Sequence, residues 1–470
     1  MSMVVQHNMQ AANANRMLGI TSGAQAKSTE KLSSGYKINR AADDAAGLTI
    51  SEKMRKQIRG LDKASSNAQD GVSSVQTAEG ALTEVHSMLQ RMNELAVQSA
   101  NGTNSSDDRQ AIQDEVDQLT TEIDRVAETT KFNEIYLLKG DNSNTKNVYM
   151  KGHDAGLKGT LTDGAKSATF TMDALQAGDK YTIAGKEYTI GSATTEVTAL
   201  IDKANTDATA DTANKTVDVN GKTYTITYNA AGNTIADADG TAITLDNLKK
   251  AVTGGSKVTY GNTSLTAMTD ADADGVDDDD SSIITKDVAE TKIKAELLTA
   301  NNIGTVDQAA TVEDANTANG KISYTINKGY ATVADTLSFN LHVGADADMT
   351  NKITVDIDTM NSANLGIKGI NVKDASGTEA TYAIDAIADA VAKVSSQRSA
   401  LGAVQNRLEH TIDNLDNISE NTSSAESRIR DTDMAKEMVN YSKNNILAQA
   451  GQSMLAQANQ SNQGVLSLLQ

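Results

Sequence analysis

Apolar residues recur at seven-residue intervals near both ends of this chain, and this pattern limits its fold more than any other feature. The first series is Met54, Leu61, Ala68, Val75, Leu82, Leu89 and Ala96, and the second is Ile387, Val394, Leu401, Leu408 and Leu415. Both series have the spacing of coiled-coil helices, in which one stripe of side chains faces a partner. Because neither helix can bury its own stripe, we expect the two end regions to pack together into one bundle.

The middle of the chain differs from the ends and is rich in Gly, Thr and Asp. The tripeptide Tyr-Thr-Ile occurs at 181–183, 188–190, 224–226 and 324–326, and three of these copies follow a Gly-Lys pair. β-Branched and aromatic residues between glycine turns indicate β-hairpins. Short helices are predicted near 194–204, 243–252 and 287–299. The predicted fold class is mainly α with a β insert, in which terminal helices pair into a coiled-coil core and the centre forms strand-rich α+β outer domains.

Local signals place the helix boundaries in the end regions. A long helix is expected over about 44–99, with a break at 101–106, a second helix from Asp107 and a third over roughly 384–420. Gly35 suits a left-handed helix stop, and Asp43 and Asp44 suit the N-terminal cap of the long helix. Three layers are predicted: a terminal coiled-coil layer (1–42 and 432–470), a helical core domain (43–175 and 375–431) and variable outer domains (176–374).

The two terminal segments carry almost no charge. Apart from His7, residues 1–15 contain no side chain that can be charged at neutral pH, and from Tyr441 to Gln470 only Lys443 is charged. An exposed helix normally carries Lys and Glu on its wet face. An amide-rich helix is better suited to burial against copies of itself, because burying partnered Asn or Gln costs far less than burying ions. The alternative is that both tails are disordered in the monomer and fold on assembly.

Composition excludes several functional classes. The 470 residues carry a net charge of −20, whereas nucleic acids and anionic membranes select basic surfaces, so neither is an expected partner. The chain has no Cys and no Pro, although average proline usage is about 5%. Refolding without X-Pro bonds has no slow isomerisation step, which suits a protein that is exported unfolded. The sequence shows neither a cleavable apolar leader nor a membrane-length apolar stretch, so if the protein leaves the cell, we expect a route that does not cleave an apolar leader.

The most specific information lies in three groups of motifs in the end regions. They are Lys31-Leu32-Ser33-Ser34-Gly35 followed by Ile38-Asn39, Ala41 and Asp43-Asp44-Ala45-Ala46-Gly47; Leu89-Gln90-Arg91 with Glu94-Leu95-Ala96-Val97-Gln98; and Gln457-Ala458-Asn459-Gln460 with Val465-Leu466-Ser467-Leu468-Leu469. These motifs resemble those of bacterial flagellin, over roughly residues 1–140 and 380–470. The resemblance implies a structural subunit that polymerises into the flagellar filament for motility. It also implies type III flagellar export, without a cleaved signal peptide, to an extracellular filament.

The resemblance also implies partners and contact residues. The partners are other copies of the chain, an export chaperone, a filament cap, hook-junction proteins and a Toll-like receptor of animal cells. The receptor-contacting motif of the family maps to Arg91, Leu95 and Glu115, and the alternative is that these residues serve only packing between subunits. The residues expected in the polymer core are Leu61, Leu82, Leu89, Leu401, Leu408, Ile446, Met454 and Leu455.

One acidic stretch has the beginning of a metal-binding pattern. Asp270, Asp272 and Asp274 precede Gly275 at the spacing of the first half of a calcium loop. Ser281 stands where such a loop needs a bidentate Glu, so an acidic exposed turn is the alternative. The five His residues lie too far apart for a local zinc signature, and thiol catalysis needs a Cys. We therefore predict no catalytic residues, no enzymatic activity and no cofactor.

Two other functions are compatible with coiled-coil ends. A non-flagellar adhesin or surface-layer subunit would need charged, self-sufficient terminal helices, and the terminal segments of this chain are nearly free of charge. A hook-filament junction protein, or another secreted surface-filament protein, is the closer alternative. The length of the chain and its large central insert favour the filament subunit.

Overall fold

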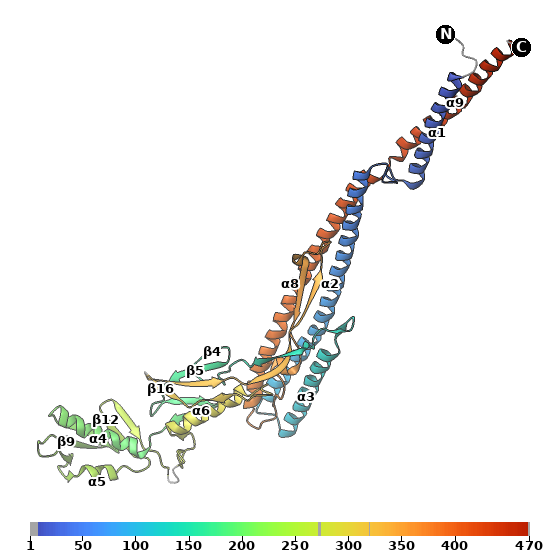
Figure 1. Ribbon diagram of the computed structural model, residues 1–470. Helices are drawn as coiled ribbons and strands as arrows, with labels where there is room; N and C mark the ends of the chain where they lie inside the picture. Colours follow the sequence, from blue (N-terminus) through green and yellow to red (C-terminus); the bar gives the residue numbers. More distant parts are fainter. Residues whose placement is uncertain (1–7, 271–273, 319, 469–470) are drawn as a thin grey trace. The chain divides into compact units, whose positions relative to one another are not determined.

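The computed structural model describes residues 8–270, 274–318 and 320–468 and divides into two compact units. Unit 1 contains Met1–Val75, Phe339–Val355 and Gly402–Gln470, and unit 2 contains Gln76–Ser338 and Asp356–Leu401. The fold class predicted from the sequence is confirmed, because long helices form both end regions and strands fill the centre (Figure 1).

The helices are α1 (Met9–Ser34), α2 (Ala45–Ser99), α3 (Ser106–Thr129), α4 (Thr194–Ala210), α5 (Leu245–Lys250), α6 (Lys286–Asn301), α7 (Ser362–Leu365), α8 (Thr378–Arg430) and α9 (Met434–Leu468), with a 3-10 turn at Met349–Asn351. The strands are β1 (Lys131–Phe132), β2 (Ile135–Tyr136), β3 (Asp141–Tyr149), β4 (Thr160–Asp163), β5 (Ser167–Asp173), β6 (Lys180–Ile183), β7 (Lys186–Ile190), β8 (Lys215–Val219), β9 (Lys222–Thr227), β10 (Thr234–Asp237), β11 (Ala242–Ile243), β12 (Lys257–Tyr260), β13 (Thr263–Thr266), β14 (Ile283–Ile284), β15 (Thr311–Val312), β16 (Asn316–Ala318), β17 (Lys321–Asn327), β18 (Tyr330–Asp335), β19 (Leu337–His342) and β20 (Lys352–Ile357).

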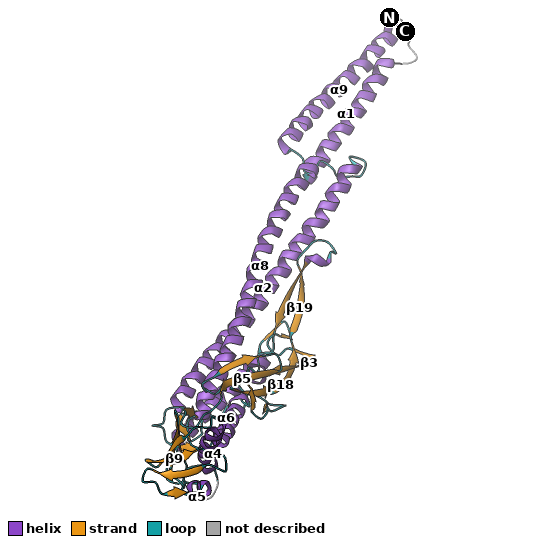
Figure 2. Cartoon of the chain, turned by 90° about the vertical axis from the view of Figure 1, so that its left-hand side faces the viewer, coloured by secondary structure: helices purple, strands orange, loops and turns teal. Residues whose placement is uncertain are grey.

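The long helices α2 and α8 bury the two seven-residue series. The buried members are Leu61, Ala68, Val75, Leu82, Leu89 and Ala96 on α2, and Ile387, Val394, Leu401, Leu408 and Leu415 on α8. In unit 1 the two helices lie side by side (Figure 2), and Ala68 and Leu408 belong to one buried cluster. Burying a Leu or Val side chain contributes about 1.5–3 kcal/mol, so this seam is a major source of stability.

The terminal helices α1 and α9 also pack against each other within unit 1 (Figures 1 and 2). Gly35 ends α1 with φ of 77°, and its N–H donates to the Lys31 carbonyl, as predicted. Asp44 caps α2, because its Oδ1 accepts from the Gly47 N–H at 2.9 Å. Asp43 was also expected to cap α2, but its Oδ2 instead accepts from the N–H groups of Asn39 and Arg40 and closes the preceding turn.

In unit 2 a third long helix, α3, packs beside the chain that leads into α8. A capping box starts it: Ser105 accepts from the Asp108 N–H, and Asp108 accepts from the Ser105 N–H. The Gln113 side chain donates to the Ile370 carbonyl at 2.9 Å and accepts from the Val372 N–H at 2.7 Å. Both hydrogen bonds are buried, so they fix the segment before α8 on the surface of α3.

The glycine-containing repeats form the predicted hairpins. The Tyr-Thr-Ile copies lie in β6, β7, β9 and β17. Ala184 and Gly185 have φ of 50° and 77° in the β6–β7 turn, and Asn220 and Gly221 have φ of 52° and 78° in the β8–β9 turn. Two consecutive positive φ values are the geometry of the type I′ turn, which suits the twist of a two-residue hairpin. The three predicted short helices are present as α4, α5 and α6.

Among the described residues of unit 2, two large strand-rich cores stand beside a small cluster of Met150, Ala331 and Val333 at the β3–β18 pair. One sheet has the order β11-β10-β9-β8-β12-β13, and α4 and α5 pack on it around Ile201, Ile226 and Leu248. The sheets β15-β17-β5-β4 and β14-β7-β6 share a second core with α6, in which Phe170 and Tyr324 are completely buried. Alternate residues of β5 and β17 are buried, as expected of strands with one face on a core.

The strand pair β19–β20 packs on the long helices. Most of its residues, 339–355, belong to unit 1, and the domain boundaries given above stay a prediction. Val343 and Ile353 of this hairpin pack on Ala68 and Leu408 of the long helices. The hairpin therefore covers the α2–α8 seam, and the apolar contacts that hold it there join residues far apart in sequence.

Candidate assembly surface

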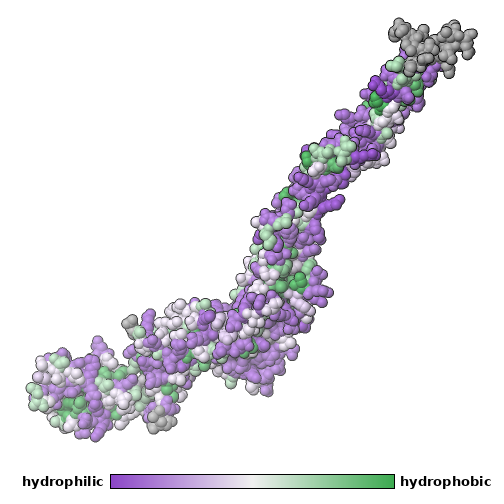
Figure 3. All heavy atoms as spheres, in the orientation of Figure 1, coloured by the Kyte–Doolittle hydropathy of each residue, from purple (hydrophilic) through white to green (hydrophobic). Residues whose placement is uncertain are grey.

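The paired helices α1 and α9 make an unusual surface, because large apolar side chains on them remain exposed. Exposed members are Met9, Met17 and Ile20 on α1, and Met434, Met438, Val439, Ile446, Leu447 and Met454 on α9. Figure 3 shows apolar patches among polar surface over these helices. Exposed apolar patches can mark protein-binding surfaces, so the α1–α9 pair is a candidate for one.

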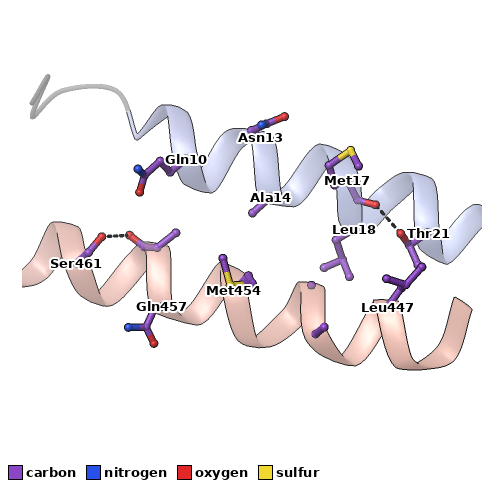
Figure 4. A pocket seen from close by; sticks show the side chains of 13 residues that line it. Gln10, Asn13, Ala14, Met17, Leu18, Thr21, Leu447, Met454, Gln457 and Ser461 are labelled. Carbon is purple, nitrogen blue, oxygen red and sulfur yellow. Dashed lines mark hydrogen bonds between the residues drawn. The ribbon is translucent and has the colours of Figure 1, made fainter. Parts of the chain in front are cut away.

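A groove of about 640 Å3 runs along the α1–α9 pair. Figure 4 shows Leu18, Leu447 and Met454 between the two helices, while Asn13 and Gln457 point away from the contact. The Asn8 side chain links the ends of the pair, because its Oδ1 accepts from the Ala11 N–H and its Nδ2 donates to the Ala458 carbonyl. The groove is lined mainly by apolar and amide side chains, which a second apolar helix can cover without burying unpaired ions.

The residues predicted for the polymer core fall into two groups. Leu61, Leu82, Leu89, Leu401 and Leu408 are buried within the chain itself. Ile446 and Met454 are 66% and 64% exposed, and Leu455 is partly buried, all on α9. The first group therefore stabilises the subunit, whereas the second group is available to a neighbouring copy. The role of all eight in a polymer stays a prediction.

Two connecting segments, one between α1 and α2 and one between α8 and α9, join the α1–α9 pair to the rest of unit 1. Gly35 and Lys37 form backbone hydrogen bonds with Thr432 and Arg430 respectively. The guanidinium groups of Arg430 and Arg55 lie 4.9 Å and 5.8 Å, respectively, from the centroid of the Tyr36 ring. Arg430 also donates to Glu52 at 2.6 Å, and this hydrogen bond lowers the pKa of the Glu52 carboxyl. Backbone hydrogen bonds, cation–π contacts and an ion pair thus hold these two connecting segments together.

The three residues of the predicted receptor motif differ in accessibility. Arg91 donates from Nε to Glu115 Oε1 at 2.8 Å and from Nη1 to Glu94 at 3.1 Å. These contacts, with Glu115 first, raise the pKa of the Arg91 guanidinium. Arg91 and Glu115 lie together on the exposed surface, but Leu95 is only 2% exposed. The receptor contact stays a prediction, for which this surface offers Arg91 and Glu115.

In the acidic stretch, the Asp270 carboxylate accepts two backbone hydrogen bonds. Asp270 Oδ1 accepts from the Asp274 N–H and its Oδ2 from the Gly275 N–H. Asp272 lies outside the described residues, so the calcium loop stays a prediction. Among the described residues, no three His, Asp or Glu side chains converge in a way that could hold a metal ion. Nor does any described helix combine the length and apolar content that a membrane span needs.

One set of structural residues was missed at the sequence level. A Cβ added to Gly71 would lie 2.2 Å from Leu341 Cδ1, and one added to Gly60 would lie 3.0 Å from Ala345 Cβ. These two glycines let the β19–β20 hairpin approach α2 closely. Because Gly in a helix interior costs about 1 kcal/mol relative to Ala, its presence at two helix positions was a usable signal of close packing.

Comparison with known proteins decides the family. The bacterial flagellin N-terminal helical region matches residues 5–143, and the bacterial flagellin C-terminal helical region matches residues 384–469. The flagellin of Clostridium tyrobutyricum is 39% identical, over 98% of this chain and 100% of the relative. Flagellin B of Vibrio anguillarum is 36% identical over the full length of both chains. The chain belongs to the bacterial flagellin family. The flagellin of Halalkalibacterium halodurans, 34% identical over 99% of this chain and 100% of the relative, agrees.

This flagellin is a structural subunit that polymerises into the extracellular bacterial flagellar filament for motility. The relatives match from end to end, so the resemblance seen in the end motifs extends over the central insert as well. The hook-junction alternative gains no support from these relatives, all of which are flagellins.

Proposed function

We propose that this flagellin polymerises through the α1–α9 pair, whose exposed apolar side chains become buried against neighbouring copies. The observation that carries the proposal is the combination of exposed Ile446 and Met454 with a segment, 441–470, whose only charged side chain is Lys443. Covering such a surface removes apolar area from water without stranding ions. A contact between different faces of neighbouring copies need not close into a ring, so it can propagate as a helical polymer.

Truncation tests this surface directly. A chain ending at Asn440 lacks most of α9, and we expect it to remain soluble and fail to extend filament seeds. The matched control removes residues 194–266 and joins the cut with a short Gly-Ser linker. That module has a core of its own, and Ser192 and Ala267 at its base pair in a β-bridge. Filaments from the truncated chain, or loss of filaments in the control alone, would reject the proposal.

The export route and the accessory partners belong to the same proposal. Export in an unfolded state through the flagellar type III pathway is supported by the absence of Pro and Cys from the chain, since neither isomerisation nor disulfide formation then delays refolding. The expected partners are an export chaperone, a filament cap and hook-junction proteins. An export chaperone that binds the C-terminal helix should be captured by the full-length chain and lost with residues 441–470; equal capture by both would contradict it. We assign the chain a mechanical role without an enzymatic one.

Recognition by a Toll-like receptor is a second candidate, because Arg91 and Glu115 form an exposed ion pair at the predicted motif. In a receptor reporter assay, Arg91→Ala should lower activation by the monomer, and Arg125→Ala serves as control because Arg125 is an exposed α3 arginine paired with Glu122. Unchanged activation by Arg91→Ala together with impaired filament growth would assign these residues to subunit packing only.

A further inference from the structure

A pocket of about 310 Å3 lies in unit 2, well separated in sequence from the terminal helices. It is bounded by α8, by the C-terminal turn of α7 and by the segment that follows β3. Its lining includes the apolar residues Met150, Ile303 and Leu365 and the polar residues His153, Asp389 and Lys393. This volume is at the lower end of the range for small-molecule sites, which is about 300–1,000 Å3. The combination of an apolar wall with opposite charges restricts what the pocket can hold.

The two opposite charges of the pocket are on the same helix but do not pair. Asp389 and Lys393 are four residues apart on α8, with the acid on the N-terminal side, which is the favourable order for an ion pair along a helix. Instead, Asp389 Oδ1 accepts from Lys151 Nζ at 2.9 Å, and Lys393 Nζ donates to the Asn364 carbonyl at 2.8 Å. Among the described residues, no ion pair joins Asp389 to Lys393. The pocket thus presents a carboxylate and an ammonium group that point to separate partners.

Each of these groups has bonding capacity left over. Asp389 Oδ2 has no hydrogen-bond partner among the described residues, although His153 Nε2 lies 3.5 Å from it. Lys393 has three N–H donors, and its interaction with Asn364 uses one of them. Burial lowers the pKa of Lys393, against the opposing influence of Asp389 and Asp358. An anion beside Lys393 would offset the cost of burying its charge, and a cationic donor beside Asp389 would satisfy its free Oδ2 atom.

We propose that this pocket binds a free α-amino acid with an aliphatic side chain. The ligand carboxylate accepts from Lys393 Nζ, and the ligand ammonium donates to the Asp389 carboxylate in the place held by Lys151, whose side chain is 62% exposed and free to swing outward. The aliphatic group lies against Met150, Ile303 and Leu365. An α-amino acid carries its ammonium and carboxylate groups on the same carbon atom. Side chains four apart on a helix have Cβ atoms about 5–6 Å apart, so one ligand can span them.

A monocarboxylate or a monoamine would satisfy only half of the site. A monocarboxylate gains only the Lys393 contact and leaves Asp389 paired with Lys151, and a monoamine leaves Lys393 without an anion. A site that hydrogen-bonds a polar group discriminates strongly against analogues that lack this group. This selectivity separates the proposed amino-acid site from a general anion site.

The test uses the full-length dispersed protein and three ligands of the same shape. They are L-leucine, 4-methylpentanoate, which lacks the ammonium group, and 3-methylbutylamine, which lacks the carboxylate. Saturation-transfer NMR and calorimetric titration should detect leucine, and each analogue should bind roughly tenfold or more weakly. Either analogue binding as tightly as leucine would overturn the proposal, as would the absence of leucine binding at millimolar concentration.

Variants locate the site. Lys393→Met keeps the length of the apolar stem but removes the charge, and should weaken leucine binding about tenfold or more. Lys158→Met is the matched control, because Lys158 is exposed, belongs to the same unit and lies outside the pocket; it should bind leucine like the wild type. Wild-type binding by a folded Lys393→Met variant would overturn the proposal, and if that variant does not fold, the three-ligand comparison on the wild type decides.

Discussion

Replacing Ile446 by serine tests the assembly surface with little risk to the fold. Full burial of an isoleucine contributes about 1.5–3 kcal/mol, and 66% of Ile446 is exposed in the single chain, so assembly gains about 1–2 kcal/mol from it. Ile446→Ser should therefore raise the critical concentration for filament growth about 5- to 30-fold. The thermal midpoint of the monomer should change little, because surface substitutions usually alter stability by less than about 0.5 kcal/mol.

The assay measures the protein left in the supernatant after seeded growth and sedimentation, over a series of total concentrations. Val306→Ser is the matched control, since Val306 is a β-branched residue that is 44% exposed in the central region, and its replacement should leave the critical concentration unchanged. Filament growth of Ile446→Ser at the wild-type critical concentration would contradict burial of Ile446 on assembly. An equal rise of that concentration in both variants would contradict it as well.

Three further predictions concern stability. Leu408→Ala should lower the free energy of unfolding by about 2–5 kcal/mol, because this buried side chain fills the seam under the β19–β20 hairpin; a loss below about 1 kcal/mol in urea titrations would contradict this packing. The Arg430 hydrogen bond lowers the pKa of Glu52 below its ordinary value of 4.5, so its stabilisation is present above that pH and lost as the pH falls through the lowered value. The thermal midpoint of the wild type should thus fall more steeply below pH 4.5 than that of Glu52→Gln, while the exposed control Glu420→Gln should follow the wild type. Ser105→Ala removes the cap of α3 and should cost about 0.5–2 kcal/mol, seen as faster amide exchange in its first turn; unchanged exchange would argue against the capping box.

The predictions from sequence succeeded where the signal is local. The seven-residue series identified the buried face of α2 and α8 because a helix repeats its contact face almost every seven residues. Gly-Lys pairs located hairpin turns because only a few residue types accept positive φ at low cost. The same local reasoning found the end of α1 at Gly35.

The predictions were incomplete where the contact is between distant residues. Nothing within Leu337–His342 distinguishes a hairpin that packs on α2 from one in a central sheet, because both show strand-like patterns. Asp43 was expected to cap a helix and instead closes a turn, since two adjacent carboxylates compete for the same role. Asp389 binds Lys151 and Lys393 binds the Asn364 carbonyl, and both partners come from other elements of the fold, so the sequence of α8 alone does not predict these contacts.

A pair of introduced cysteines tests most directly whether α1 and α9 of one subunit remain paired in the filament. A Cβ built on Gly451 would lie 3.9 Å from the Cβ of Leu18, within the range of about 3.5–4.5 Å that a disulfide needs, and the chain contains no Cys of its own. Filaments of the Leu18→Cys, Gly451→Cys double variant should, after oxidation and denaturation without reductant, run as single chains closed by an internal disulfide. Unlinked chains, or chains linked only to their neighbours, would contradict the pairing of the two ends.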